Sequence, residues 1–243
     1  MSEHGRDHDA NLPGGIGMSR LRVYGSVSGD GQAGGSPHMH LICRELYYVL
    51  RGSGAVETLT LREGFARVPL GPGDVFHFGP GTVHRLANTD GLEILVIMQN
   101  AGLPERGDAV LTFPDADLRD LDTYLALARA DSLGDAEARR DRAVEGFGEL
   151  RRAFGRSAQA GAAALHGFHS RAVTLARGRA AAWPALFEEG AALETSETER
   201  RLDALVRGEG GYLEAAASAL TKAEPEGASR LGMCGHLWPV AAW

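Results

Sequence analysis

Short apolar runs separated by turns fill the first part of the chain. Between residues 21 and 99, runs rich in Val, Ile, Leu, Tyr and Phe alternate with the turns Gly52-Ser53-Gly54, Gly71-Pro72-Gly73 and Gly79-Pro80-Gly81. The runs predict strands at residues 21–24, 39–43, 46–50, 55–61, 66–70, 74–78, 83–87 and 92–99. Many short strands at regular spacing favour a β-sandwich or a β-barrel over an α/β fold.

The pattern changes after Pro114, where the composition shifts to Ala, Arg, Glu and Leu. Apolar residues then recur at helical spacing at Leu118, Leu121, Leu125 and Ala128, and again at Val144, Phe147, Leu150 and Phe154. This spacing predicts amphipathic helices that each bury one face. Ser196 and Glu199 form a capping-box pattern that predicts a helix start, with Gly208 as the stop. A further helix is expected over residues 212–222.

The last segment, residues 225–243, reads as irregular but ends in apolar side chains. Those side chains are expected to pack on another surface, because exposing apolar area is costly: Leu237, Trp238, Val240 and Trp243. The expected organisation is a flexible N-terminus at 1–19, a barrel at 20–112 and a helical region at 113–243. We expect the helical region to pack on the barrel or on the partner in a homodimer.

Composition narrows the class of function. The 243 residues carry a formal net charge of −7, and an acidic surface repels phosphate backbones and anionic lipids. We therefore expect no nucleic acid and no membrane as partner. Two cysteines, Cys43 and Cys234, do not resemble a disulfide framework, and the first residues lack the pattern of a secretory signal. The expected location is the cytoplasm.

Candidate chemistry lies in two stretches, HMHLICRELYYVLRG at 38–52 and GDVFHFGPGTVHRLAN at 73–88. His38 and His40 are two residues apart, so a strand would project both imidazoles from one face. With Glu45 and His84 they offer a mixed nitrogen and oxygen site that suits Fe(II), Mn(II), Ni(II), Cu(II) or Zn(II). Four protein ligands leave two positions open on an octahedral ion, which is the layout of a catalytic site.

These two stretches resemble the signatures of the cupin superfamily, G(X)5HXH(X)3,4E(X)6G and G(X)5PXG(X)2H(X)3N. The first signature is matched from the histidine pair to Gly52, although Gln32 stands at the position of the leading glycine. The second is matched at Gly73, Gly81, His84 and Asn88, with Gly79 in place of the usual proline. The resemblance covers roughly residues 20 to 100.

The resemblance implies a mainly β plus α protein. Its β part would be a double-stranded β-helix, or jelly-roll barrel, with one metal ion inside. It also implies that His38, His40, Glu45 and His84 are the metal ligands. Iron is the expected metal, and Mn, Ni, Zn or Cu also suit the site. The reaction is not implied, since this fold hosts enzymes of several classes, regulators and storage proteins.

Two further residues are candidates for catalysis. Tyr47 is expected to share the inward face of Glu45, where its phenol would either donate to a substrate or fill the barrel. His77 would act as an acid or base if its strand face points inward, but an outward position packed beside Phe76 and Phe78 is favoured. Arg85 adjoins His84 and is expected to point the opposite way, into solvent.

Three functions fit this sequence. The leading hypothesis is a mononuclear metalloenzyme on a small polar substrate, with a non-haem iron dioxygenase as the leading guess. The second is a sugar or sugar-phosphate isomerase, epimerase or lyase, because residues 81–97 are similar to the cupin part of mannose-6-phosphate isomerases. A phosphate subsite would need basic side chains at the barrel mouth, and the β part offers Arg44, Arg51, Arg62, Arg67 and Arg85. The third is a non-enzymatic, ligand-sensing cupin.

Overall fold

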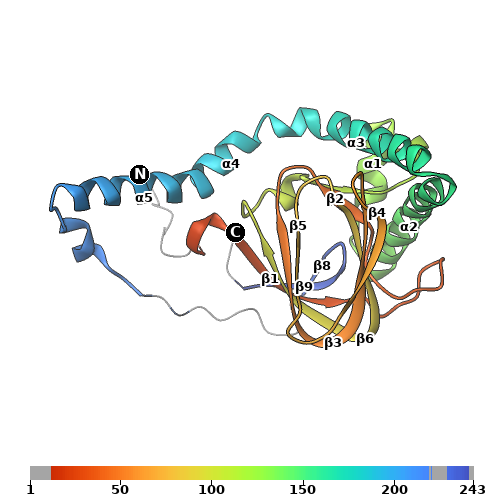
Figure 1. The fold of residues 1–243 in the computed structure, drawn as a ribbon, viewed down its shortest axis with the longest axis horizontal. Coiled ribbons are helices and arrows are strands. Elements are labelled where there is room, and N and C mark those ends of the chain that lie inside the picture. Colours follow the sequence, from red (N-terminus) through yellow and green to blue (C-terminus); the bar gives the residue numbers. More distant parts are fainter. Residues whose placement is uncertain (1–11, 219, 221–228, 241–243) are drawn as a thin grey trace.

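An antiparallel sheet of nine strands forms the body of the protein (Figure 1). The computed structural model describes residues 12–218, 220 and 229–240. The strands are β1 (Gly17–Val23), β2 (His38–His40), β3 (Glu45–Thr60), β4 (Gly64–Leu70), β5 (Val75–Phe78), β6 (Val83–Met98), β7 (Ala109–Leu111), β8 (Arg230–Leu231) and β9 (Gly235–Pro239). Neighbours follow the order β4-β3-β6-β1-β9-β8, while β5 pairs with β3, β2 with β6, and β7 with β2. The sheet rolls up, but its described ladder does not close into a continuous barrel.

Two long strands, β3 and β6, replace four predicted short ones. Each is 16 residues long, and they pair along their whole length with register shifts between Val49 and Gly54. Gly52 and Gly54 were predicted to form a turn between two strands, but they lie at a bend within the continuous strand β3. Gly52 has a φ of 75°, and a Cβ atom there would lie 2.3 Å from the carbonyl oxygen of Gly91. Only glycine fits this corner, which folds the hairpin over itself.

The bend matters for the candidate site. Glu45 begins β3 and is opposite Met98, whereas His84 lies at the other end of the ladder, opposite Thr58. Because the hairpin folds over itself, these two distant ends approach, and Glu45 Oε2 lies 3.2 Å from His84 Nε2. His38 joins them directly, since β2 pairs with β6 at His38 and His84.

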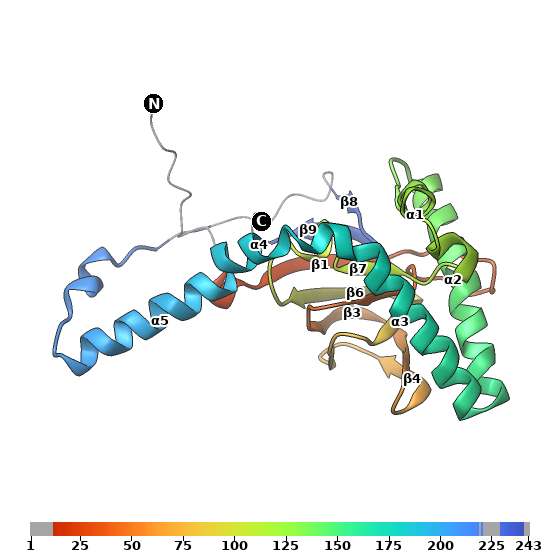
Figure 2. The same cartoon turned by 90° about the horizontal axis from the view of Figure 1, so that it is seen from above.

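Helices cover one side of this sheet. They are α1 (Leu121–Ala128), α2 (Leu133–Arg156), α3 (Ala158–Ala180), α4 (Trp183–Glu189) and α5 (Ala191–Val206). Figure 2 shows α2 and α3 side by side, next to the edge formed by β4. Their apolar faces share one core with β2, β6 and β7, in which Met39, Val83 and Leu111 meet Phe147 and Leu165. A β part followed by helices confirms the predicted fold class.

Helix boundaries agree only in part with the sequence pattern. Ser132 and Asp135 form a reciprocal capping box at the start of α2. The capping box predicted at Ser196 is wrong, because α5 already begins at Ala191 and runs through Ser196. The predicted stop is confirmed, since α5 ends at Val206 and Gly208 has a φ of 76°. In place of a helix over 212–222, the described residues form a short 3-10 helix at Gly211–Ala215.

The end of the chain returns to the sheet. Residues 230–239 were expected to be irregular, but they form β8 and β9, and β9 pairs with β1 from Gly235 to Pro239. Trp238 is 3% exposed, and the guanidinium groups of Arg20 and Arg22 lie over its ring at 5.2 and 5.4 Å. Trp238 thus packs on the β part, whereas Trp243 lies outside the described residues.

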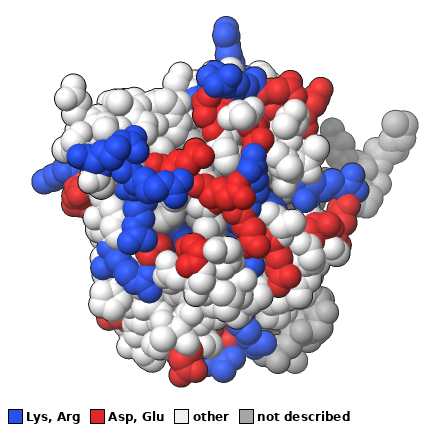
Figure 3. Space-filling view, turned by 90° about the vertical axis from the view of Figure 1, so that its right-hand side faces the viewer, with Lys and Arg blue, Asp and Glu red and all other residues white. Residues whose placement is uncertain are grey.

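Charges on the helical side are mixed in sign. Figure 3 shows Arg side chains interspersed with Asp and Glu on the face that lies to the right in Figure 1. Arg142 pairs with Asp117 at 2.6 Å, and Arg171 pairs with Asp115 at 2.9 Å. Such a surface is typical of solvated helices. None of the described helices is long and apolar enough to cross a bilayer.

Candidate metal centre

Four buried side chains converge inside the rolled sheet. His38 and His40 come from β2, Glu45 from the start of β3 and His84 from the start of β6. Each offers one ligand atom, and these atoms all lie within 4.8 Å of one another. On β2 the alternation of a strand points both imidazoles to the same side. All four side chains are buried, so the cluster is sheltered from bulk water.

Each imidazole is held by its Nδ1 atom, which leaves Nε2 to face the centre. His38 Nδ1 donates to the Ser36 carbonyl at 2.9 Å, and His84 Nδ1 donates to the Thr82 carbonyl at 3.1 Å. His40 Nδ1 lies 2.9 Å from Asp108 Oδ2. These partners fix the ring orientation and the tautomer, as the outer partners of metal-binding histidines do.

The centre of the cluster favours positive charge. His38 Nε2 and His84 Nε2 lie 3.1 Å apart, yet in the neutral tautomers fixed by their Nδ1 bonds both would present lone pairs. Glu45 Oε2 is buried without a hydrogen bond, although the Nε2 atoms of His40 and His84 are 3.3 and 3.2 Å away. A cation between these atoms would satisfy all of them. The donor set of three imidazoles and one carboxylate fits a divalent transition metal.

Burial and neighbouring charge shift the pKa values of the cluster. Burial, together with the imidazoles of His84 and His40, lowers the pKa of His38 well below its usual value. Burial acts in the same direction on His40, but the bond to Asp108 and the carboxylate of Glu45 outweigh it and raise the pKa to about 9. Although burial acts to raise it, the imidazoles of His40 and His84 hold the pKa of Glu45 well below its usual range. The carboxylate is therefore ionised and ready to bind a cation.

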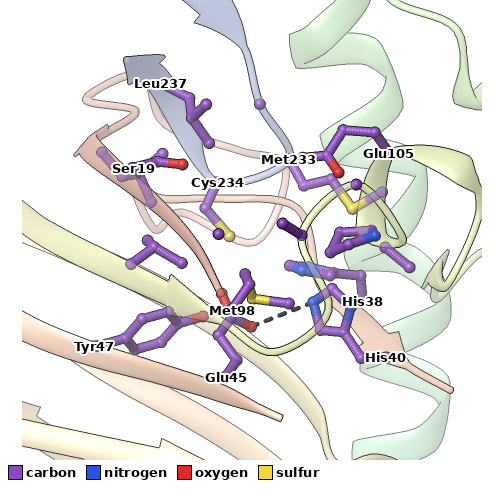
Figure 4. A pocket seen from close by; sticks show the side chains of 18 of the residues that line it. Ser19, His38, His40, Glu45, Tyr47, Met98, Glu105, Met233, Cys234 and Leu237 are labelled. Carbon is purple, nitrogen blue, oxygen red and sulfur yellow. Dashed lines mark ion pairs between the residues drawn. The ribbon is translucent and has the colours of Figure 1, made fainter. Parts of the chain in front are cut away.

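A cavity of about 410 Å³ leads to the cluster. It reaches His38, His40 and Glu45, and Tyr47 and Cys234 line the wall beside them (Figure 4). Most of the remaining wall is apolar: Leu21, Val96, Met98, Leu231, Met233 and Leu237. Its size falls in the range of small-molecule sites, about 300–1,000 Å³. The arrangement combines a cation site with a mostly apolar chamber for a small ligand.

Comparison with known families agrees with this geometry. Residues 28–98 match the family model described as a cupin domain. Residues 28–98 are therefore a cupin domain. No curated protein sequence matches it significantly.

Solved structures resemble parts of this chain. A putative sugar phosphate isomerase from Acidithiobacillus ferrooxidans is 26% identical, with a TM-score of 0.28; the match covers 35% of this chain and 49% of that protein. A cupin protein from Bacteroides fragilis is 21% identical, with a TM-score of 0.29 and coverage of 42% and 85%. Oxalate decarboxylase from Bacillus subtilis is 22% identical, with a TM-score of 0.30 and coverage of 35% and 21%. This chain thus spans about half the length of the isomerase, and likeness at these TM-scores carries no information on its activity.

The two candidate catalytic residues lie in different places. Tyr47 is buried in the cupin domain and lines the cavity, and its hydroxyl has no hydrogen-bond partner. Burial, with the neighbouring charge of Glu45, raises the pKa of Tyr47 well above its usual value. His77 is exposed, as is Val75, so this face of β5 points outward. His77 is not among the residues that line the cavity, and we give it no catalytic role.

The expectation that Arg85 is solvated is wrong. Arg85 is fully buried in the cupin domain, and its guanidinium pairs with Asp30 at 2.5 Å and donates to Ser28 Oγ at 3.0 Å. Because successive side chains on a strand point to opposite faces, Arg85 points away from His84, as predicted. The loop at residues 28–30 covers that outer face, which the local pattern does not reveal.

Three functional features have no signal in the local sequence. Asp108 is buried, binds His40, and accepts hydrogen bonds from the backbone amides of Leu41 and Ile42 at 3.1 and 2.6 Å. Cys234 reaches the cavity from the segment between β8 and β9, and Arg139 reaches it from α2. All three are far in sequence from the ligands they approach, so only the tertiary fold reveals them.

Proposed function

We propose that this protein is a mononuclear metalloenzyme in which His38, His40, Glu45 and His84 hold one divalent metal ion. Iron is the proposed metal, and the proposed reaction is the oxidation of a small organic molecule by dioxygen. One observation carries the proposal: three imidazole Nε2 atoms and a buried carboxylate oxygen without a hydrogen bond converge beside a cavity of about 410 Å³. A structural metal would need no such chamber.

The residues of the chain have distinct roles in this proposal. A bound Fe(II) would supply Lewis-acid and one-electron chemistry at the four ligands. Asp108 and the carbonyls of Ser36 and Thr82 hold the imidazoles in the tautomer that exposes Nε2. Tyr47 stays protonated, because its pKa is raised, and its hydroxyl donates a hydrogen bond to an oxygen atom of the substrate. The apolar wall excludes water and so strengthens these polar interactions.

A sugar-phosphate isomerase is a weaker fit. Phosphate binding needs several basic side chains in the cavity, but Arg139 is the one arginine or lysine in its lining, and none of Arg44, Arg51, Arg62, Arg67 and Arg85 lines it. Arg51 pairs with Glu93 at 2.7 Å and Arg67 pairs with Glu57 at 2.5 Å, both outside the cavity. The mostly apolar wall also offers few partners for the hydroxyl groups of a sugar. A non-enzymatic ligand sensor would share the cluster and the cavity but would turn over no substrate.

We also propose that the protein acts as a homodimer in the cytoplasm. Helix α5 extends away from the sheet (Figure 1), none of its residues is buried, and its exposed side chains include Leu202, Leu205 and Val206. Two copies of α5 packed against each other would bury these three apolar side chains. Analytical ultracentrifugation of Leu205→Glu should give a monomer; an unchanged mass would contradict this interface.

Metal analysis and oxygen uptake test the proposed enzyme. Protein purified without added metal should contain about one iron per chain and consume oxygen with a subset of small organic substrates. His84→Ala should lose most of the metal, and Glu45→Gln, which keeps the size of the side chain, should lose it too. His77→Ala is the matched control, because His77 is exposed and outside the cavity. Circular dichroism shows whether each variant is folded. Full metal occupancy in a folded His84→Ala variant would refute the site, and iron without oxygen uptake would refute the oxidation.

A further inference from the structure

Three arginines are buried in the described part of the chain, and they differ in their partners. Arg85 contacts Asp30, and Arg140 contacts Asp141 at 3.0 Å as well as the carbonyls of Ser26 and Val27. Arg139 is 8% exposed, and no described carboxylate forms an ion pair with it. Burying a charge is costly unless an opposite charge compensates. Arg139 is therefore a buried cation that lacks a counter-ion.

The guanidinium of Arg139 is held in place but only partly satisfied. Its Nη2 atom donates to the Gly232 carbonyl at 2.8 Å, and its Nη1 atom approaches the Ala128 carbonyl at 3.4 Å. Its Nε atom is buried and has no hydrogen-bond partner. Five N–H groups are available on a guanidinium, so several donors remain for a ligand. A fixed fork of donors suits a carboxylate, which can accept two parallel bonds.

Arg139 lines the same cavity as the four-residue cluster. It enters from α2, outside the cupin domain, whereas His38, His40 and Glu45 reach the cavity from β2 and β3. Among the residues that line the cavity, Arg139 is the one arginine or lysine. Apolar side chains such as Leu21, Met98 and Met233 supply most of the wall. The cavity therefore offers a cation site and a guanidinium within a mostly apolar chamber.

We propose that Arg139 binds one carboxylate of an organic diacid whose other carboxylate reaches the cluster of His38, His40 and Glu45. This inference rests on the proposed metal function and specifies its substrate class. It also gives the helical region a role in specificity, because α2 supplies the residue that selects an acidic substrate. A neutral substrate would leave the buried guanidinium uncompensated, which disfavours its binding.

Short diacids and their half-amides provide the test. Malonate, succinate and glutarate differ in length, and malonamate, succinamate and glutaramate keep one carboxylate while an uncharged amide replaces the other. Binding is measured by isothermal calorimetry on the Mn(II)-loaded protein, with Mn(II) binding itself measured separately by magnetic resonance titration. At least one diacid should bind the wild type about 10- to 100-fold more tightly than its half-amide, as expected for a charge-assisted bond.

Variants separate charge recognition from a structural role. Arg139→Gln should abolish the preference for the diacid while leaving the half-amide affinity within about threefold and the Mn(II) affinity unchanged. Arg139→Lys should restore part of the preference, since it restores the charge but not the fork. Arg152→Gln, an exposed site on the same helix, should leave the preference intact. If Arg139 merely supported the fold, both ligands would lose affinity together.

The outcomes separate the two proposals. Failure of the wild type to bind Mn(II) would overturn the metal site. Mn(II) binding with equal affinity for every diacid and its half-amide would overturn the Arg139 subsite and leave the metal site standing. A preference for the diacid that survives in Arg139→Gln would also overturn the Arg139 subsite.

Discussion

Asp108 gives a sensitive test of the metal centre, because it acts on a ligand without being one. Its Oδ2 atom faces His40 Nδ1 at 2.9 Å, while Oδ1 accepts from the amides of Leu41 and Ile42. In Asp108→Asn the oxygen can keep both amide bonds, which places the new NH2 group against His40. Two donors cannot face each other, so His40 must move its proton to Nε2. That atom then presents a hydrogen to the cluster in place of a lone pair.

The magnitude follows from the role of such outer partners. Their loss typically costs about 10- to 100-fold in metal affinity, which corresponds to roughly 1.4 to 2.8 kcal/mol. Competition between the protein and a coloured chelator for Mn(II) or Fe(II) measures this affinity. Asp122→Asn, on the exposed side of α1, is the matched control and should bind metal as the wild type does. If folded Asp108→Asn keeps the wild-type affinity within twofold, Asp108 does not set the tautomer of His40.

Three further predictions concern stability. Gly52→Ala should destabilise the fold by at least about 1–2 kcal/mol, because its φ of 75° penalises any L-residue and a Cβ would clash with Gly91; chemical denaturation should show this loss, with Gly29→Ala, which has open space, near wild type. Trp238→Ala should cost about 3–5 kcal/mol, whereas Val173→Ala, 59% exposed on α3, should change little; an equal effect of both would contradict the packing of β9. Burial acts to raise the pKa of Asp30, but Arg85 holds it well below its usual range, so this ion pair stabilises the protein above about pH 4 and the benefit is lost as the pH falls below it. Melting curves should therefore show the gap between the wild type and Asp30→Asn narrowing in acid, and a constant gap would contradict the pairing.

All four residues of the cluster were named from the sequence, and for one pair the reason is local geometry. His38 and His40 alternate on one strand, so local geometry alone puts them together. Their approach to Glu45 and His84 depends on the bend at Gly52. From the sequence, Gly52 was predicted to lie in a turn between two separate strands. A glycine between two apolar runs indicates a change of direction, but it does not tell a strand end from a bend. The assignment of strand ends at this position was therefore wrong, while the ligand set remains a proposal supported by the convergence of the four side chains.

Features that depend on distant contacts were not predictable from local patterns. Arg85 occupies the outward position that alternation predicts, yet the loop carrying Asp30 buries it. The segment 230–239 lacks the regular alternation of a strand, but it finds a free edge on β1. Arg139 lies on α2, and its guanidinium is held by the carbonyl of Gly232, 93 residues later in the chain. The division of the chain near residue 113 stays a prediction, and strands from the last residues already join the sheet of the first part.

The position of β9 sets an order of assembly during synthesis. The four cluster residues lie within positions 38–84, whereas Leu231, Met233, Cys234 and Leu237 form one wall of the cavity from the far end of the chain. β9 joins the sheet on the edge of β1 that β6 leaves free. A ribosome therefore releases all the ligands long before it releases this wall. Until this segment has been made, the cluster lacks that side of its enclosure.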